Sequence, residues 1–544
     1  MAATEDSSRT SIVPGTPTVS SRYMNLLPGD EQRANYARQV NSALYSIAAP
    51  TPVSAPTTLL WSKSVSADLG FDRKFCESAE FAALMSGNKT FPGSEPFAMR
   101  YGGHQFGQWA GQLGDGRAIN LGELAASDGR VLNLQLKGAG PTPYSRGADG
   151  RAVLRSSVRE YLCSEAMFHL GVPTTRALSL VLTGDEVLRD MFYDGNAQQE
   201  PGAIVCRVAP TFIRFGHFQL CAYRGETEIL KQLMDHTIVA DFPHLPNPAE
   251  CAEAQRRQVY LRWFEEVCRR TGDMVLAWMR VGFVHGVMNT DNMSILGLTI
   301  DYGPYGWIDD YNPEWTPNTT DAQGRRYRFG QQADIALWNL YQLANALLVV
   351  LEDPDPVQKI LEDYQRYYDA AWTTMMLSKL GLTTNLGESD DALLAELLAL
   401  LAEQETDMTI FYRKLADFDP SLPASDLLSV VEEAFYAPDA MPQELHARYE
   451  VWANTYATRL RGEALDYETR KTNMNAVNPW FVLRNYLAQE AIEHAQKGDY
   501  SMLYALDEAL LNPYVEQAQF AQFFAKRPEW ARHRAGASML SCSS

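Results

Sequence analysis

One segment constrains this chain more than any other: His285-Gly286-Val287-Met288-Asn289-Thr290-Asp291-Asn292, followed after a short apolar run by Asp301-Tyr302-Gly303. Asn292 and Asp301 supply hard oxygen ligands of the kind that Mg²⁺ takes beside nucleotide phosphates. An Asp-Asn pair alone is more typical of a turn or a helix cap, but the whole arrangement is far more specific than its parts. It predicts a metal-dependent nucleotide site.

A similar spacing is found in protein kinases. Their catalytic loop reads H-x-D-x-x-x-x-N, and their later metal-binding turn reads D-F-G. The first Asp of that pattern accepts the substrate proton, but Val287 stands at this place here. Asp291 is the nearest carboxylate that could replace the missing base. The chain is therefore either catalytically inactive or performs different chemistry on a nucleotide.

The composition of the chain limits the kinds of partner that it can bind. The 544 residues, of which 46% are hydrophobic and 21% charged, are typical of a globular protein with two or more lobes. A formal net charge of -20 argues against nucleic acid, because phosphate-backbone binders need a basic surface. No apolar run approaches the roughly eighteen residues that cross a bilayer, so we expect no membrane partner. Residues 1–20 lack a hydrophobic centre, which predicts a cytoplasmic protein, or a mitochondrial matrix protein if the chain is eukaryotic.

The order of patterns predicts an α+β fold. Alternating side chains indicate half-buried strands at 118–124 and 131–137, and a helix at 155–170 closed by Gly171 follows. The remaining expectations are a strand pair around 203–208 and 218–222 and helices at 331–351 and 390–404. Sheet first and helices second is the order of a two-lobed, protein-kinase-like (pseudokinase) fold. The expected parts are a flexible N-terminal arm (1–45), a sheet-rich N-lobe (46–235), a helical C-lobe (236–475) and a helical C-terminal extension with a cysteine-containing tail (476–544).

Two segments of the predicted N-lobe are candidates for phosphate contacts. Gly114, Gly116 and Arg117 lie in a glycine-rich turn, which could equally be an ordinary hairpin. Lys137 ends the next strand, as the phosphate-pairing lysine of a kinase does, although a lone lysine there is usually a solvated charge. Its partner on the following helix would be Glu160, with Glu165 as a competitor that periodicity cannot exclude.

Two further candidates are rich in arginine or glycine. The loop 138–151, which contains Asp149 and Gly150, is longer and richer in Gly and Arg than a strand-to-helix connection requires; it is either a ligand loop or a surface loop. Arg207 and Arg214 lie in an apolar segment of an acidic chain. They either bind an anion or form structural ion pairs.

The assembled motifs resemble the selenoprotein O (SelO) family of protein adenylyltransferases, called YdiU in bacteria. The resemblance runs from about Leu59 to the end, and these segments carry it: Tyr101 to Gly107, Leu136 to Gly140, Arg155 to Arg176, His285 to Asn292, and Asn478 to Leu487.

The resemblance implies a kinase-like fold that binds ATP in a flipped orientation and transfers AMP to Ser, Thr or Tyr hydroxyls, with release of pyrophosphate. Asp291 would then be the proton acceptor, and Asn292 and Asp301 the ligands of Mg²⁺, with Mn²⁺ as the alternative. The nucleotide would be held by Gly114, Gly116, Arg117, Lys137, Asp149, Gly150, Arg207, Arg214 and Asp301.

The seven cysteines show no C-x-x-C spacing, so neither a zinc site nor a disulfide framework is expected. The resemblance gives Cys542 a redox role, because family members end in a selenocysteine or cysteine followed by two residues. Some bacterial relatives pair that thiol with a cysteine after the D-x-G turn, but 315–318 contains none. A mixed disulfide with glutathione remains open, as does an incidental thiol on a frayed terminus.

The sequence thus predicts a magnesium-dependent protein adenylyltransferase. Its expected partners are ATP and proteins with hydroxyl side chains, including the enzyme itself, and we expect a monomer. A kinase-like phosphotransferase is one alternative, which Val287 argues against. A non-catalytic nucleotide-binding scaffold is another, which the retained metal ligands argue against.

Overall fold

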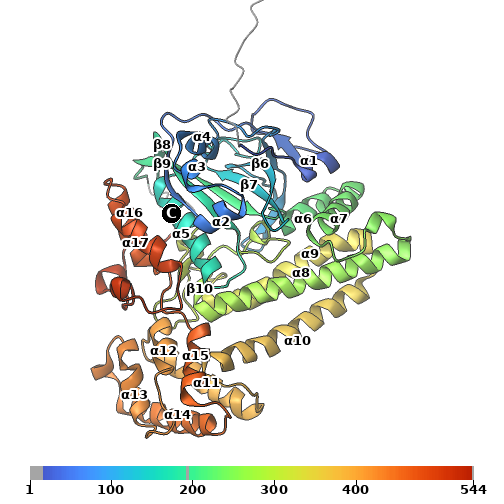
Figure 1. The fold of residues 1–544 in the computed structure, drawn as a ribbon. Helices are drawn as coiled ribbons and strands as arrows, with labels where there is room; N and C mark the ends of the chain where they lie inside the picture. The colour runs from blue at the N-terminus through green and yellow to red at the C-terminus, as the bar shows by residue number, and fades with distance from the viewer. Residues whose placement is uncertain (1–15, 192–194, 542–544) are drawn as a thin grey trace, which may run out of the picture.

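The structure is a computed structural model that describes residues 16–191 and 195–541 (Figure 1). Its N-terminal part is built on a seven-stranded sheet of order β1-β3-β6-β7-β9-β8-β2, in which every neighbouring pair is antiparallel. The strands are β1 (Tyr45–Ile47), β2 (Thr57–Trp61), β3 (Phe97–Met99), β6 (Ala118–Ala125), β7 (Val131–Lys137), β8 (Arg176–Arg189) and β9 (Gln198–Ala209). The sheet-rich part precedes a helical part, as the sequence predicted.

Side chains alternate between the two faces of this sheet. Leu134 and Leu136 of β7 pack into a cluster that also contains residues of β9 and of the small helices α2 (Lys63–Asp68), α3 (Arg73–Cys76) and α4 (Ala79–Ser86). The opposite face is covered by α5 (Leu154–His169). Lys137 and Arg207 alternate with the residues of that cluster and therefore lie on the α5 face, where the functional site forms.

Two small antiparallel ladders complete the frame of the site. The hairpin of β4 (Gly102–Gln105) and β5 (Gln108–Gln112) packs against the short turn Thr290–Asn292 and against α6. The ladder of β10 (Phe283–Val284) and β11 (Gly306–Trp307) closes the ends of the loop that contains Asp291 and Asp301. Both acidic residues are therefore displayed from one closed loop.

Long helices form the C-terminal part. They are α6 (Phe215–Tyr223), α7 (Thr227–Asp241), α8 (Glu253–Val281), α9 (Gln332–Leu351) and α10 (Pro354–Lys379). Within the described residues, Phe329–Leu351 is one helical stretch that by length and composition could cross a membrane, a feature that the sequence analysis did not recognise. Half of its most apolar window is buried, and α9 packs against α6, α8 and α10, as core helices do.

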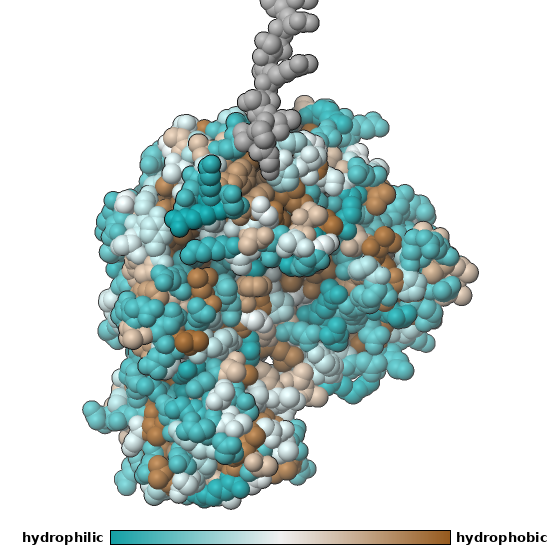
Figure 2. Space-filling model, viewed as in Figure 1, coloured by the Kyte–Doolittle hydropathy of each residue, from teal (hydrophilic) through white to brown (hydrophobic). Residues whose placement is uncertain are grey.

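The chain ends in a further group of helices. These are α11 (Glu388–Glu403), α12 (Met408–Leu415), α13 (Asp426–Val431), α14 (Gln443–Arg461), α15 (Tyr467–Val477), α16 (Asn485–Ala495) and α17 (Ser501–Leu510). The last two return to the N-terminal part and pack against α5 (Figure 1). The face of the molecule shown in Figure 2 is largely polar with scattered apolar residues.

Two expectations were wrong. The segment 218–222 is part of helix α6 and is not a strand. Because α6 is buried continuously from Phe215 to Cys221, its sequence has no polar and apolar periodicity that would distinguish a helix from a strand. Residues 16–45 are not a loose arm. Helix α1 (Arg22–Leu26) buries Tyr23, and Arg22 Nε lies 3.1 Å from Glu123 Oε2 on β6. Residues 1–15 lie outside the described residues.

Candidate active site

The cation expected to contact phosphate is held by a carboxylate of α5. Lys137 Nζ lies 2.6 Å from Glu160 Oε2, and both side chains are buried. The competitor Glu165 lies on another part of the helix, where it pairs with Arg176 at 2.6 Å. Burial lowers the pKa of Lys137 below its usual value, while Glu160 and Asp301 oppose that shift.

Three cations converge on Asp301. Arg207 and Arg214 both contact its carboxylate, and Lys137 Nζ lies 3.4 Å from Oδ1. Burial alone would raise the pKa of Asp301, but Arg214, Arg207 and Lys137 outweigh burial and hold that pKa well below its usual range. Asp301 also has a left-handed backbone (φ 58°), uncommon for a residue other than glycine. The carboxylate is therefore ionised and fixed in place.

The two arginines have different second contacts. Arg207 also approaches Glu160 at 3.3 Å and contacts Gln135. Arg214 donates to the backbone carbonyl of Asp291 at 2.8 Å and stacks over the Tyr101 ring, with 4.7 Å between Cζ and the ring centroid. Arg214 thus connects the Asp301 carboxylate to the turn that carries Asp291. The sequence left open whether these arginines bind an anion or form ion pairs; in the structure they form ion pairs beside an open cavity.

Asp291 has the features of a general base. It lies on a short 3₁₀ turn (Thr290–Asn292) and is 7% exposed. Gln105 Nε2 donates to Oδ2 at 3.3 Å, whereas Oδ1 has no hydrogen-bond partner among the described residues. Burial raises the pKa of Asp291 to about 6, against the lowering effect of Arg214. One carboxylate oxygen is therefore free to take a proton near neutral pH.

Gly103 of β4 leaves the space that Asp291 occupies. A Cβ at Gly103 would lie 2.4 Å from Asp291 Oδ1, closer than any carbon and oxygen can approach without movement. We expect Gly103→Ala to displace the Asp291 carboxylate. The rate of the expected AMP transfer should then fall by about 100-fold, because a displacement near 1 Å can have that effect. Gly324→Ala is the matched control, since its Cβ would meet nothing closer than 3.8 Å. Equal rates for the two variants would contradict this packing.

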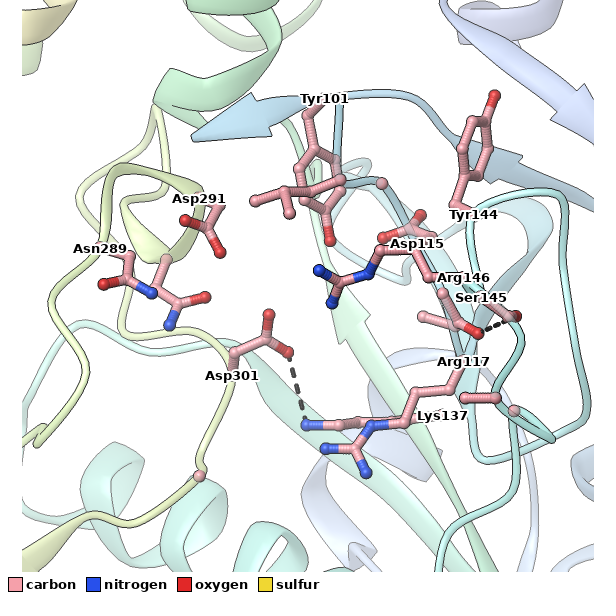
Figure 3. Close-up of a pocket in the computed structure, with 18 of the residues that line it drawn as sticks. Tyr101, Asp115, Arg117, Lys137, Tyr144, Ser145, Arg146, Asn289, Asp291 and Asp301 are labelled. Atoms are coloured by element: carbon pink, nitrogen blue, oxygen red, sulfur yellow. Dashed lines mark hydrogen bonds and ion pairs between the residues drawn. The ribbon is translucent and has the colours of Figure 1, made fainter. Parts of the chain in front are cut away.

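A cavity of about 670 Å³ joins these groups (Figure 3). Asp291 and Asp301 lie on one side, and Arg117 and Lys137 on the other. The predicted residues that line it are Gly114, Gly116, Arg117, Lys137, Asp149, Gly150, Arg207, Arg214, Asp291, Asn292 and Asp301. Glu160 is not among the lining residues and acts on the cavity through Lys137.

Sequence reasoning missed several lining residues: Tyr101, Gln105, Phe106, Asp115, Tyr144, Arg146, Arg189 and Asn289. Asp115 stands between two glycines that were singled out, and burial raises its pKa above the usual value. Asn289 lies within the segment 285–292. By contrast, Arg189 comes from the end of β8 and pairs with Asp149 at 2.6 Å, a contact for which the sequence shows no signal.

The residues present fit a divalent cation held jointly with phosphate. Asn292 Nδ2 donates to the Val287 carbonyl at 2.9 Å, so the amide oxygen is left as an acceptor, and Asp301 is ionised. No three His, Cys, Asp or Glu side chains gather as a metal cluster in the part of the chain that the structure describes. A cation here would complete its shell with water and phosphate oxygens, as Mg²⁺ usually does.

The C-terminal tail approaches the segment that follows the D-x-G turn. Leu540 donates to the Pro317 carbonyl at 3.0 Å, and Thr319 donates to the Leu540 carbonyl at 2.8 Å. Cys542, for which a redox role was predicted, lies outside the described residues.

Comparison with known proteins adds an independent finding. The family model described as "Protein adenylyltransferase SelO" matches residues 32–511. A Rhodopirellula baltica protein named "Protein nucleotidyltransferase YdiU" is 55% identical over 537 residues, covering 97% of this chain and 99% of that protein. Proteins of the same name from Azoarcus sp. (55% over 524 residues; 96% and 99%) and Aromatoleum aromaticum (54% over 530 residues; 97% and 99%) are similarly close.

Proposed function

Because this chain belongs to the SelO family of protein adenylyltransferases and is a protein nucleotidyltransferase, we propose that it transfers AMP from ATP to Ser, Thr or Tyr hydroxyls at the cavity around Asp291 and Asp301. The observation that carries this proposal is that Asp291, whose buried Oδ1 has no hydrogen-bond partner among the described residues, lines the same cavity as Lys137, Arg207 and Arg214. A candidate base and three cations that could bind phosphate therefore line one cavity. The proposal includes a kinase-like arrangement of the sheet-rich and helical parts.

In the proposed step, Asp291 takes the proton from the acceptor hydroxyl. The hydroxyl oxygen forms a bond to the α-phosphorus of ATP while the bond from that phosphorus to the bridging oxygen breaks. Pyrophosphate leaves with the electrons of that bond. Lys137, Arg207 and Arg214 stabilise the negative charge of the phosphates because they are already oriented and buried.

Asn292 and Asp301 would hold Mg²⁺, which when bound would neutralise phosphate charge. Arg207 and Arg214 keep Asp301 ionised for that role. The three cations therefore have two successive partners, the Asp301 carboxylate in the free enzyme and the phosphates after ATP binds.

Intact-mass analysis after incubation with ATP and Mg²⁺ tests the function. A gain of about 329 Da on the enzyme or a protein substrate is one AMP, and a gain of about 80 Da is one phosphate. The AMP adduct in wild type but not in Asp301→Asn is the expected result. The phosphate adduct would establish a kinase instead, and ATP binding without any adduct on candidate substrates would favour a scaffold.

The transfer reaction should lose activity in acid. Asp291 accepts a proton only when it is ionised, so kcat/KM for the acceptor should fall as the pH drops below about 6, where the free enzyme's Asp291 becomes protonated. A profile between about pH 5 and 8 measures this. Wild-type kcat/KM that stays constant down to pH 5 would exclude Asp291 as the titrating base.

A further inference from the structure

The hairpin tip beside Asp291 places one aromatic ring in the wall of the cavity. Phe106 lines the cavity, is 38% exposed and has a left-handed backbone (φ 51°). Its backbone N–H donates to Tyr327 Oη at 3.0 Å and to Asn289 Oδ1 at 3.2 Å, and its ring centroid lies 5.3 Å from that of Tyr327. An exposed aromatic ring in a strained turn is thus held against the segment 285–292 by hydrogen bonds.

Arg326 lies against this hairpin tip, and Arg325 precedes it in the chain. The Arg326 guanidinium stacks on Trp338, with Cζ 4.6 Å from the ring centroid, and lies against the turn glycine Gly107, where a Cβ would be 3.4 Å from Cζ. Arg325 is exposed and has a left-handed backbone (φ 45°). An acidic chain here presents two adjacent positive charges beside its active site.

Neither of these arginines is held in an ion pair within the described residues. Arg328 of the same segment pairs with Glu314 at 3.0 Å, whereas neither Arg325 nor Arg326 has a carboxylate within ion-pair distance. The nearby Asp321 is buried, and its oxygens accept backbone N–H groups of residues 326 and 327 at 3.0 and 2.7 Å. Asp321 attracts the Arg326 guanidinium without forming an ion pair with it, so both arginines keep donors that a ligand at the protein surface can reach.

We propose that the hairpin tip and Arg325–Arg326 form the docking site for the acceptor segment, and that this site selects hydroxyls with an acidic residue nearby. The proposal rests on the proposed function, since it assigns the protein substrate of that reaction. The acceptor side chain would pass Phe106 to reach Asp291, while a carboxylate of the same segment would pair with the arginines. Arginine beside an aromatic surface is a frequent combination in protein recognition.

The contacts limit how far that acid lies from the hydroxyl. Gln105 contacts Asp291, and Gly107 contacts Arg326. Only Phe106 lies between them, so their Cα atoms are at most about 7.6 Å apart, which is two to three residues of an extended peptide. The acid should therefore lie within about three positions of the modified residue.

A peptide library tests this. Each peptide carries one central Ser, Thr or Tyr with randomised flanks, and the enzyme labels it from ATP labelled at the α-phosphate. We expect labelled peptides to be enriched in Asp or Glu within about three positions, with kcat/KM at least tenfold above Lys-flanked peptides at low salt, and less so at high salt.

Charge reversal separates recognition from catalysis. Arg325→Asp combined with Arg326→Glu should invert the preference toward Lys-flanked peptides; Asp is chosen at position 325 because it tolerates a left-handed backbone. Arg73→Glu, on exposed helix α3, is the matched control and should keep the acidic preference.

The outcomes distinguish this inference from the function beneath it. Uniform or basic enrichment, or labelling of the enzyme itself with no labelled peptide, would overturn the docking site and leave adenylyl transfer standing. No label on any peptide or protein, with ATP still bound, would reject the proposed function.

Discussion

Asp291→Asn is expected to lower AMP transfer by about 10²–10⁴-fold, the range lost when a general base is removed. Asn matches the shape of Asp but cannot accept the acceptor proton. ATP affinity should be unchanged or slightly tighter, because one negative charge beside the phosphates is removed. Single-turnover transfer rates and ATP titration measure the two effects separately.

The control for that variant is Asp128→Asn. Asp128 lies in an exposed turn, where it contacts Arg130, and is not among the cavity-lining residues. The same chemical change there should leave the rate at the wild-type value. Retention of the full rate in Asp291→Asn would remove Asp291 as the base and would leave its free Oδ1 without a function.

Asp301→Asn is expected to affect both catalysis and stability. Transfer should fall by about 10²–10³-fold or more, since the variant loses a charged group that organises the phosphates and would hold the cation. The folded state should lose about 3 kcal/mol, the lower end of the range for breaking a buried ion pair, because 23% of the Asp301 side chain is exposed. Thermal unfolding without nucleotide measures the second effect.

Pyrophosphate provides a sharper measurement on the same variant. With Asp301 neutral, Lys137, Arg207 and Arg214 have an excess of positive charge, which an added anion can offset. Pyrophosphate without metal should therefore raise the unfolding temperature of Asp301→Asn more than that of the wild type. An equal rise in both would show that the three cations do not depend on Asp301.

The sequence predicted those helices and strands whose apolar residues recur with a recognisable period. Alternation identified β6 and β7, and the spacing of Val158, Leu162 and Ala166 identified α5. The sequence-based prediction was wrong for α6, which is buried on all sides. It was also wrong for residues 16–45, a polar segment with only a few buried residues such as Tyr23.

The site also contains residues that the sequence predicts and contacts that it does not. Lys137 and Asp301 belong to motifs with a fixed spacing, so the sequence could find them. The choice between Glu160 and Glu165 depends on the rotation of α5 relative to the sheet, which periodicity leaves open. The Arg189–Asp149 pair joins a strand end to a distant loop, and the Phe106–Tyr327 contact spans more than 200 residues. Only the three-dimensional arrangement reveals contacts of that kind.

Helix α5, which carries Glu160, is held on both sides. Its inner face lies on the sheet, and α16 and α17 pack against it. The carbonyl of Leu170, which caps the C-terminus of the helix, accepts from Tyr514 Oη at 2.8 Å and from Arg280 at 2.6 Å. The orientation of Lys137 is therefore settled when the protein folds, before any nucleotide arrives. Association with ATP should then follow a single kinetic phase whose rate rises linearly with ATP concentration, without a slow helix movement that limits it.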